Sequence, residues 1–364
     1  AKRFNNRWVH TIDMKKREKN DHGKKIRCAV IGTGRIGSSL ETDRLREKPA
    51  SHAGAIAHNK ETILVAGADP DADNLAAFGK LWRLTPDALF PDARAMLETV
   101  KPDIVHIASD TEEHIPLLRL AIEHEVPVIV LEKPVAQTID EAREMRPLVE
   151  EAERLATSRI VVNHERRFAA DYRAIRSVIA AGELGSLLSI HARLYMGKTK
   201  TPEKVLWHDG THLVDIIAFL AGAWDVRETR GTVDAKSGNF IAIGETLPAS
   251  SSAEPVSIIL EASPGRDHLV FELDLSFSSG RARIGNGTFE LWESRPSRLY
   301  EQFRSLELVR GRPGRGYGKT GYFSGMMAHA VALFRDPTLP GESTFADGLS
   351  AIELLDRIIG RARM

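Results

Sequence analysis

Short apolar runs alternate with amphipathic stretches through the first half of the chain. Runs with the length and β-branched content of buried strands lie at 26–31, 62–68, 103–109, 126–131 and 159–162. Helix-period patterns separate several of these runs, at 72–80, 92–100 and 112–124. Alternating strands and helices predict a parallel, doubly wound sheet, which binds its ligands at the carboxyl ends of the strands.

The pattern changes after residue 170. It predicts in turn a helix at 171–181, a strand at 187–195 and a helix from His208 toward Gly222. Later β-rich runs lie at 256–262, 268–277, 282–284 and 287–292. Ser-, Gly- and Pro-rich turns lie between or before them, which favours an antiparallel meander. Amphipathic helices follow at 321–334 and 346–361, and we expect the last to pack back on the first domain.

Length and composition narrow the class of protein. The chain has 364 residues, more than one hydrophobic core usually serves, so we expect two domains, or one domain with a large elaboration. Its 50 basic and 50 acidic residues balance, which removes the electrostatic case for a nucleic-acid partner. The single cysteine, Cys28, excludes a disulfide framework and a cysteine-based zinc cluster. No apolar run approaches the roughly 20 residues that span a bilayer. We therefore expect a cytoplasmic protein without a membrane partner.

The N-terminal arm, residues 1–24, is basic. It lacks the apolar run that a secretory signal requires. Two interpretations stay open at this point. The arm is either mobile and solvated, or it packs on a partner subunit through Trp8, Val9 and Ile12.

A glycine-rich turn follows the first apolar run. The sequence Gly32-Thr33-Gly34-Arg35-Ile36-Gly37 is a GxGxxG motif between a predicted strand and the segment that leads to a helix. In such a motif the first glycine permits a tight turn and the second admits a pyrophosphate close to the backbone. The third lets the helix pack against the strand. This turn predicts a dinucleotide site.

The acid expected to hold an adenosine ribose is Asp69, at the end of the second run. It lies 32 residues after Gly37, where about 20 is usual. We interpret the charged segment 41–51 as an insertion that accounts for most of the excess. Pro70 and Asp71, which follow Asp69, offer no cation for the 2′-phosphate of NADP. Like charges about 4 Å apart repel by roughly 4 kcal/mol at an effective dielectric near 20, so we expect NAD rather than NADP. The alternative is that Asp69 is only a turn residue.

Polar residues stand where the later strands end. They are Ser109, Thr111, His114, Glu132, Lys133 and Asn163. Because the carboxyl ends of parallel strands meet at one edge of the sheet, we expect these side chains beside the cofactor.

Several of these motifs together resemble those of the glucose–fructose oxidoreductase/inositol dehydrogenase (Gfo/Idh/MocA) family. The resemblance rests on the glycine turn, Asp69, Glu132-Lys133-Pro134, and the segments 163–168 and 208–215. In ordered motifs it covers residues 25 to about 225, and it extends more loosely to the C-terminal helix. It implies an NAD(P)-dependent oxidoreductase with a carbohydrate-type substrate: a sugar, a cyclitol or a derivative. It also implies a C-terminal domain whose large open sheet often mediates oligomers.

The expected fold class is accordingly α/β. A Rossmann sheet precedes an α+β domain with a large, open, mostly antiparallel sheet. The expected boundaries are 1–24 for the arm, 25–162 for the Rossmann domain, 163–340 for the substrate domain and 341–364 for the C-terminal helix. We expect a homodimer or homotetramer formed through the C-terminal sheet.

The resemblance assigns catalytic roles to Lys133 and His212. Lys133 matches the lysine beside the nicotinamide, and His212 matches the catalytic histidine. His208 stands where many members carry an aspartate, which leaves the proton relay open and makes Asp209 a further candidate. From helical spacing alone, His208, His212 and Asp215 share one face, so Asp215 either orients His212 or bonds elsewhere. A metal site at the two histidines, completed by His164 or Glu165, is the rival interpretation.

Basic and aromatic residues mark candidate substrate contacts. Arg166 and Arg167 lie in the loop after the run 159–162, and Tyr195 and Lys198 lie at the end of the run 187–195. If that face of the strand lines the cleft, an anionic substrate fits. The alternative is that the face is an exposed sheet surface.

Two other functions remain open. One is a lyase or glycosidase that keeps its NAD and oxidises a sugar only transiently. The other is a cofactor-binding regulator without turnover. The leading hypothesis is hydride transfer, with Lys133 and His212 in proton transfer.

Overall fold

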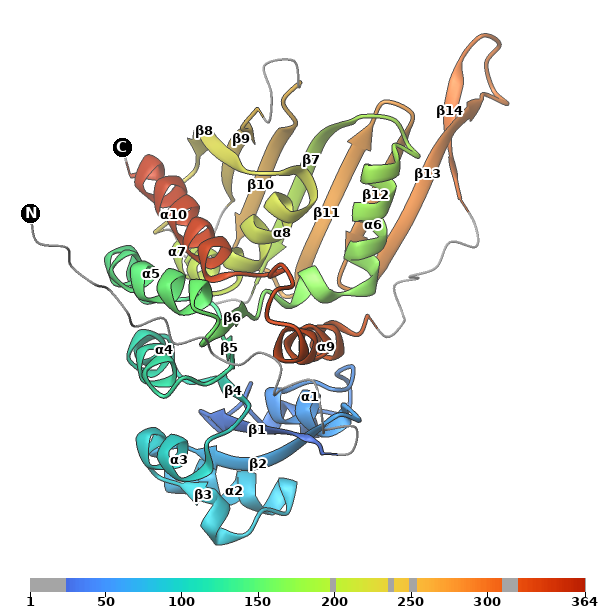
Figure 1. The fold of residues 1–364 in the computed structure, drawn as a ribbon. Coiled ribbons are helices and arrows are strands. Elements are labelled where there is room, and N and C mark those ends of the chain that lie inside the picture. The colour runs from blue at the N-terminus through green and yellow to red at the C-terminus, as the bar shows by residue number, and fades with distance from the viewer. Residues whose placement is uncertain (1–23, 197–200, 235–238, 249–253, 310–319, 364) are drawn as a thin grey trace, which may run out of the picture.

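A computed structural model describes residues 24–196, 201–234, 239–248, 254–309 and 320–363 of the chain. Two layered units lie one above the other in Figure 1, and the chain passes between them more than once. Lys198 and almost all of the basic arm lie outside the described residues.

The first unit is a parallel sheet with the strand order β3-β2-β1-β4-β5-β6. Its strands are β1 (Ile26–Ile31), β2 (Thr62–Ala68), β3 (Leu89–Phe90), β4 (Ile104–Ile107), β5 (Val128–Leu131) and β6 (Arg159–Val162). The reversal of order on either side of β1 and β4 is the doubly wound topology that the sequence predicts. The strands β4 and β5 are buried throughout, as their continuous apolar runs require.

Helices cover both faces of this sheet. One face packs on α1 (His52–His58), α2 (Ala72–Trp82) and α9 (Tyr322–Arg335). The other packs on α3 (Ala93–Val100), α4 (His114–Glu123), α5 (Ile139–Arg154) and the first turns of α10 (Phe345–Ala362). The helix α9 therefore packs on the Rossmann sheet, although its sequence lies inside the range expected for the substrate domain. The helix α10 contacts α5 and β6 of the first unit and α8 and β8 of the second.

The charged segment after the glycine turn is an insertion within the first helix. The chain leaves a helical turn near Ser38 and returns at His52, whose N–H donates to the carbonyl of Ile36. Ser51 caps the resumed helix by accepting from the N–H of Gly54. The helix α1 thus continues the turn that began at the glycine motif. The insertion explains the long spacing to Asp69.

The second unit is an open, mostly antiparallel sheet with the order β14-β13-β12-β11-β7-β10-β9-β8. Its strands are β7 (Leu187–Tyr195), β8 (Trp224–Arg230), β9 (Phe240–Thr246), β10 (Ser257–Ser263), β11 (Val270–Phe277), β12 (Gly280–Gly285), β13 (Thr288–Pro296) and β14 (Arg304–Leu308). Among the described strand pairs of this second sheet, only β7 and β10 are parallel.

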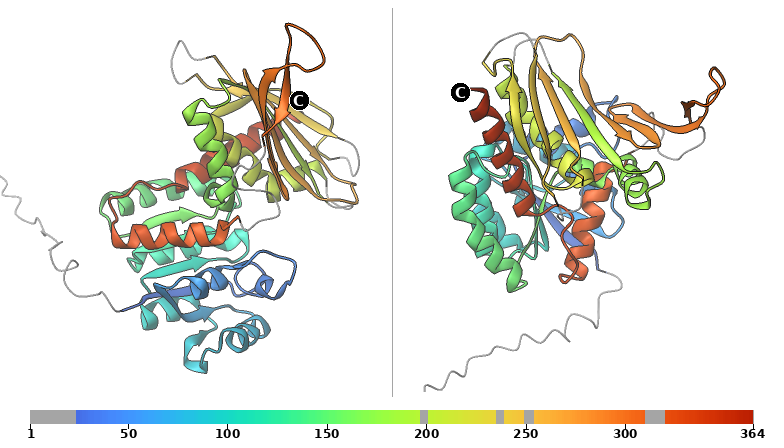
Figure 2. Two further views of the ribbon diagram at one scale, coloured as in Figure 1. Left: turned by 90° about the vertical axis from the view of Figure 1, so that its right-hand side faces the viewer. Right: turned by 90° about the horizontal axis from the view of Figure 1, so that it is seen from above.

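Helices cover one side of the second sheet, as Figure 2 shows. The covering helices are α6 (Ala170–Ala181) and α8 (Thr211–Ala221), together with α10, and they share one apolar core with the sheet. The strand β7 has the predicted bounds, and its buried residues Ile190, Ala192 and Leu194 face this core. The predicted fold class is confirmed.

The helix expected from His208 is different in the structure. A short helix, α7 (Pro202–Val205), leads into a π-helical turn at Leu206–Gly210, and only then does α8 begin. The wider π turn changes the angular spacing of side chains, so His208 and His212 are not one α-helical turn apart. The helix α5 and the strands β8, β9 and β14 are further elements that the sequence pattern did not predict.

Candidate active site

The glycine turn is held tightly against the neighbouring strand loop. Gly32 has a φ of +83°, and a Cβ there would lie 2.5 Å from the backbone nitrogen of Ser109. A Cβ on Gly37 would lie 1.9 Å from the carbonyl oxygen of Gly32. Neither position accepts a side chain, so both glycines are required for the shape of the turn.

The middle of the same turn faces open space. A Cβ on Gly34 would find no atom nearer than Asn74 Nδ2, at 3.8 Å. Within the described chain, the backbone N–H groups of Gly34, Arg35 and Ile36 donate to no other group. Free N–H groups at the start of a helix form a cradle for an anion. The residues present therefore fit the pyrophosphate of a dinucleotide.

Asp69 anchors this turn. Its Oδ2 accepts hydrogen bonds from the N–H and the hydroxyl of Thr33, at 2.7 and 3.0 Å, and its Oδ1 accepts from the N–H of Asp71 at 2.9 Å. The carboxylate is buried. Asp69 therefore links the end of β2 to the glycine turn, beside the place where an adenosine ribose would lie. Its contact with a ribose stays a prediction.

His114 ties two strand-end loops together. Its Nδ1 lies 2.7 Å from the carbonyl oxygen of Pro134, and its Nε2 lies 3.1 Å from that of Ser109. Burial lowers the pKa of this histidine. Both ring nitrogens are occupied by backbone, so His114 positions the loops rather than offering a free donor. Thr111 is half-buried in the same loop.

Glu132 is the centre of a buried polar cluster. Its Oε1 lies 2.8 Å from His52 Nε2 and accepts from Asn163 Nδ2 at 2.5 Å. Burial alone would raise the pKa of Glu132, but the contacts with His52, Lys133 and Asn163 lower it to about 2. Glu132 and Asn163, both expected beside the cofactor, therefore bond to each other.

Lys133 reaches across from the Rossmann sheet to the second unit. Its Nζ donates to the carbonyl oxygen of His208 at 2.9 Å. The nearby His212 keeps a buried Nδ1 that has no hydrogen-bond partner among the described residues. Burial and the positive charges of Lys133 and Arg166 hold the pKa of His212 well below its usual value. The structure thus brings the two principal catalytic candidates together.

His208 and Asp209 contribute differently from the expectation. The His208 ring is 65% exposed and pairs with Asp209, with 3.0 Å between His208 Nδ1 and Asp209 Oδ2. It is the carbonyl group of His208, not its imidazole, that contacts Lys133. The π-helical turn explains this, because it turns the ring outward while the backbone stays at the site.

Asp215 bonds elsewhere than to His212, which is the second of the two alternatives that the sequence left open. Its Oδ1 lies 3.0 Å from His164 Nδ1, and both side chains are buried. The centroids of the His164 and His212 rings are 6.4 Å apart. His164 is therefore a fixed neighbour of the catalytic candidate. The sequence marked it only as part of the segment 163–168 and as a possible metal ligand.

Arg167 is a buried cross-link, which corrects its assignment as a substrate contact. Its guanidinium bonds both oxygens of Asp215, at 2.7 to 3.0 Å. It also contacts Asp347 at 3.2 Å and the carbonyl oxygen of Glu342 at 2.9 Å. Its donors are directed at these protein groups and not into the site.

Arg166 keeps a position that suits a substrate contact. Its guanidinium stacks on the ring of Phe271, 3.5 Å from the centroid, and both terminal nitrogens donate to Asn286 Oδ1 at 3.1 Å. Next to it, burial raises the pKa of Glu165. Half-buried and cationic, Arg166 lies close enough to His212 to lower its pKa.

Tyr195 lies on the other face of the second sheet. The alternate residues of β7 are buried against the helices, so Tyr195 belongs to the uncovered face, where Arg266 lies over its ring. This supports the alternative of an exposed sheet surface and corrects the placement of Tyr195 near the reacting groups.

The inserted segment reaches the edge of the site. Both carboxylate oxygens of Glu47 accept from the backbone: Oε1 from the N–H of Gly321 at 2.7 Å and Oε2 from that of Thr320 at 2.8 Å. The charges of Glu47 and Glu165, together with burial, raise the pKa of Tyr322 to about 12. Tyr322, His52 and His106 are site neighbours that sequence reasoning missed, because distant elements bring them together.

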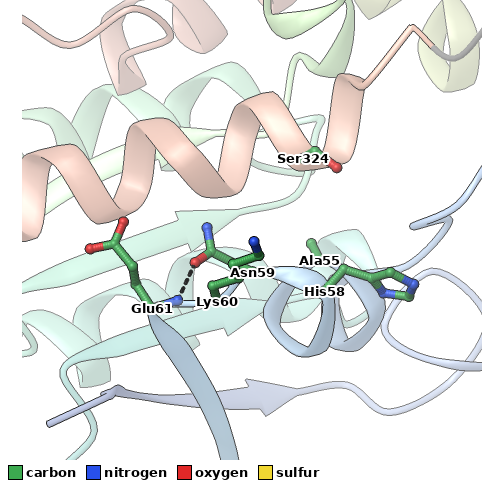
Figure 3. Close-up of a pocket in the computed structure, with 6 residues that line it drawn as sticks. All are labelled: Ala55, His58, Asn59, Lys60, Glu61 and Ser324. Carbon is green, nitrogen blue, oxygen red and sulfur yellow. Dashed lines mark hydrogen bonds between the residues drawn. The ribbon is translucent and has the colours of Figure 1, made fainter. Parts of the chain in front are cut away.

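One cavity lies away from these residues. This cavity of about 300 Å³, between α1 and α9, is lined by Ala55, His58, Asn59, Lys60, Glu61 and Ser324, and Figure 3 shows it. It contains none of the candidate site residues.

In the described part of the chain, no three His, Cys, Asp or Glu side chains could hold a metal ion together. No described helix is long and apolar enough to cross a membrane.

Known proteins resemble the chain in sequence over about two thirds of its length. The inositol 2-dehydrogenase of Corynebacterium glutamicum is 29% identical over 246 residues, which are 66% of this chain and 65% of that protein. The D-glucoside 3-dehydrogenase of Escherichia coli is 26% identical over 63% of this chain and 64% of its own length. The chain thus matches slightly less than two thirds of these relatives.

Solved structures resemble it over nearly its whole length. An inositol dehydrogenase homolog from Azotobacter vinelandii, complexed with NADH and myo-inositol, has a TM-score of 0.71 at 17% identity and covers 94% of this chain and 96% of its own. This likeness shows the fold. Residues 26–159 match a family model described as an oxidoreductase family with an NAD-binding Rossmann fold. Over these residues, which form most of the first unit, the chain is similar to the Gfo/Idh/MocA oxidoreductase family.

Proposed function

We propose that the protein is an NAD-dependent dehydrogenase or reductase that acts on a hydroxyl or ketone group of a sugar, a cyclitol or a derivative. One observation carries the proposal: Lys133 and His212, from different units, converge at the carboxyl edge of the Rossmann sheet. The names of the relatives, inositol 2-dehydrogenase and D-glucoside 3-dehydrogenase, support the substrate class.

The cofactor site follows from the glycine turn. The N–H groups of Gly34, Arg35 and Ile36 would hold the pyrophosphate, and Asp69 would hold the adenosine ribose. Asp69 and Asp71 place two carboxylates at the end of β2, which disfavours a 2′-phosphate. We therefore propose NAD rather than NADP. When bound, the nicotinamide accepts or supplies the hydride.

The protein's own groups manage the proton. Lys133 is a cation that stabilises negative charge on the substrate oxygen. Burial, together with the positive charges of Lys133 and Arg166, lowers the pKa of His212, so its imidazole is unprotonated near neutral pH and available as a proton acceptor. His164, fixed by Asp215, stands beside the His212 ring. We assign substrate binding to Arg166, which is held by Phe271 and Asn286.

We further propose that copies of the chain associate through the uncovered face of the C-terminal sheet, as a homodimer or homotetramer. A cytoplasmic location is in keeping with Cys28, a buried free thiol. Light scattering measures the mass of the protein in solution and therefore tests whether copies of the chain associate.

The experiment for the activity measures NADH absorbance with a panel of sugars, cyclitols and sugar acids, using NAD and NADP separately. We expect turnover with NAD that Lys133→Met abolishes. Lys80→Met, an exposed lysine on α2, is the control and should leave the rate unchanged. Equal rates for wild type and Lys133→Met would refute the role of Lys133. Substrate conversion with cofactor that co-purifies and is never consumed would instead indicate the lyase or glycosidase.

A further inference from the structure

A chain of buried polar side chains lies behind Lys133. His106 Nδ1 and His52 Nδ1 are 2.8 Å apart, and His52 Nε2 is 2.8 Å from Glu132 Oε1. Asn163 donates to the same oxygen, while the other oxygen, Oε2, accepts from the N–H of Lys133 at 3.3 Å. His52 and His106 are fully buried. The chain thus runs from β4 through α1 to the residue next to Lys133.

The hydrogen positions in this chain follow from Glu132. A carboxylate only accepts hydrogen bonds, so His52 Nε2 must carry a hydrogen and donate it. Glu132 remains an anion because its contacts lower its pKa to about 2. Between the two Nδ1 atoms one hydrogen is shared, whichever ring carries it. His106 Nε2 is then left buried without a partner among the described residues.

Stability alone does not account for this arrangement. A buried ring nitrogen without a partner, such as His106 Nε2, is costly, so packing by itself does not explain a histidine at this position. The position of His52 depends on the inserted segment. The chain loops out after the glycine turn and returns in helical register at this residue. Phe323 of α9 closes the cluster, with ring centroids 5.4 Å from His52.

We propose that His52, oriented by His106, is a positioning residue for Lys133 that acts through Glu132. The inference rests on the proposed function and adds a residue to its machinery. Two donors hold Glu132 Oε1, which leaves Oε2 directed at the backbone of Lys133. That contact fixes the point from which the lysine side chain extends to His208. Small displacements of reacting groups, about 1 Å, cost on the order of a hundredfold in rate.

A pair of substitutions separates positioning from packing. In His52→Gln the amide nitrogen replaces Nε2 and can still donate to Glu132, whereas in His52→Asn it replaces Nδ1 and cannot reach. We expect His52→Asn to lower kcat at least tenfold with little change in the KM for NAD, and His52→Gln to stay within about threefold of wild type. His58→Asn, an exposed histidine at the end of α1, is the matched control. Equal kcat values for the Asn and Gln variants would overturn the proposal.

Two measurements decide the inference without turnover. Nitrogen-15 NMR of histidine-labelled wild type, free of cofactor, should show a protonated Nε2 on His52, and an unprotonated Nε2 overturns the proposal. Acylation of Lys133, followed by peptide mass spectrometry with Lys80 as internal reference, should change at least threefold in His52→Asn and not in His52→Gln. An unchanged acylation rate in His52→Asn counts against positioning. Absence of turnover in wild type would refute the proposed function, and these two readouts would still decide the role of His52.

Discussion

Arg167→Met should destabilise the protein without affecting substrate binding in the molecules that remain folded. The guanidinium makes three contacts of 2.7 to 3.0 Å with Asp215, and the two side chains are 8% and 2% exposed. Removing it leaves a buried carboxylate with His164 as its remaining partner among the described residues. Breaking a buried pair by deleting one partner costs about 3–5 kcal/mol. That is a large part of the roughly 5–15 kcal/mol that stabilises a typical protein.

The matched variant is Arg166→Met, one residue earlier. Its stacking on Phe271 lies at a half-exposed site, where a cation–π contact contributes about 0.5–1 kcal/mol. We expect this variant to unfold close to wild type but to raise the substrate KM about tenfold. Urea unfolding, followed by tryptophan fluorescence and circular dichroism, measures the stabilities, and steady-state kinetics measures KM. If Arg167→Met unfolded like wild type and raised KM instead, the assignment of Arg167 as a cross-link would be wrong.

Three further predictions concern the cofactor edge and the first strand. The pKa of Glu132 is lowered from 4.5 to about 2. Because each unit of pKa shift corresponds to about 1.4 kcal/mol, its carboxylate stabilises the folded state by about 3 kcal/mol. The stability lost in Glu132→Gln, measured by urea unfolding, should be fully present above pH 4.5 and disappear as the pH falls toward 2; a constant difference would contradict this. Gly34→Ala should fold normally yet bind NAD at least tenfold more weakly in a calorimetric titration, whereas Gly32→Ala, strained and in contact with Ser109, should lower the thermal midpoint by several degrees. Burial raises the pKa of Cys28, so a disulfide reagent should label it only after denaturation, and rapid labelling of native protein would refute its burial.

Local patterns predicted the Rossmann half because its signals are short-range. The glycine turn follows β1 directly, and the apolar runs of β4 and β5 are continuous, so neither depends on distant residues. The helix α5 also carried a local signal, a capping box formed by Thr138 and Glu141. It was not predicted as a helix. Its sequence is strongly charged and contains Pro147, which weakens the apolar periodicity.

The second sheet was harder to predict for a physical reason. The strand β8 lies at an edge and is largely polar, with buried positions only at Trp224 and Val226. A half-exposed edge strand has little apolar alternation, so its pattern resembles a loop. The π-helical turn at Leu206–Gly210 has no sequence signature of this kind. In this turn the carbonyl group of His208, and not its ring, contacts Lys133.

Side-chain partners were beyond the sequence because they are set by packing between elements far apart in the chain. The adjacent residues Arg166 and Arg167 have different surroundings. Arg167 contacts α8 and α10, whereas Arg166 contacts β11. Nothing in the order Arg166-Arg167 distinguishes them. The two residues occupy different positions around the short helical turn at Glu165–Phe168, and only Arg167 of the two points toward the interior.

Lys133 and His212, the two groups to which we assign proton transfer, each lie beside a buried carboxylate–histidine pair. Behind Lys133, the buried carboxylate of Glu132 is paired with His52, and beside His212, the buried carboxylate of Asp215 is paired with His164. A buried carboxylate is costly unless it is fully bonded, so each pair fixes the geometry around it strongly. Lys133 donates directly to the His208 carbonyl, which joins the two units at the candidate site. The cation and the imidazole to which we assign proton transfer therefore lie beside separate buried networks. A change in either network should alter the rate before it alters cofactor affinity, because neither network includes the glycine turn.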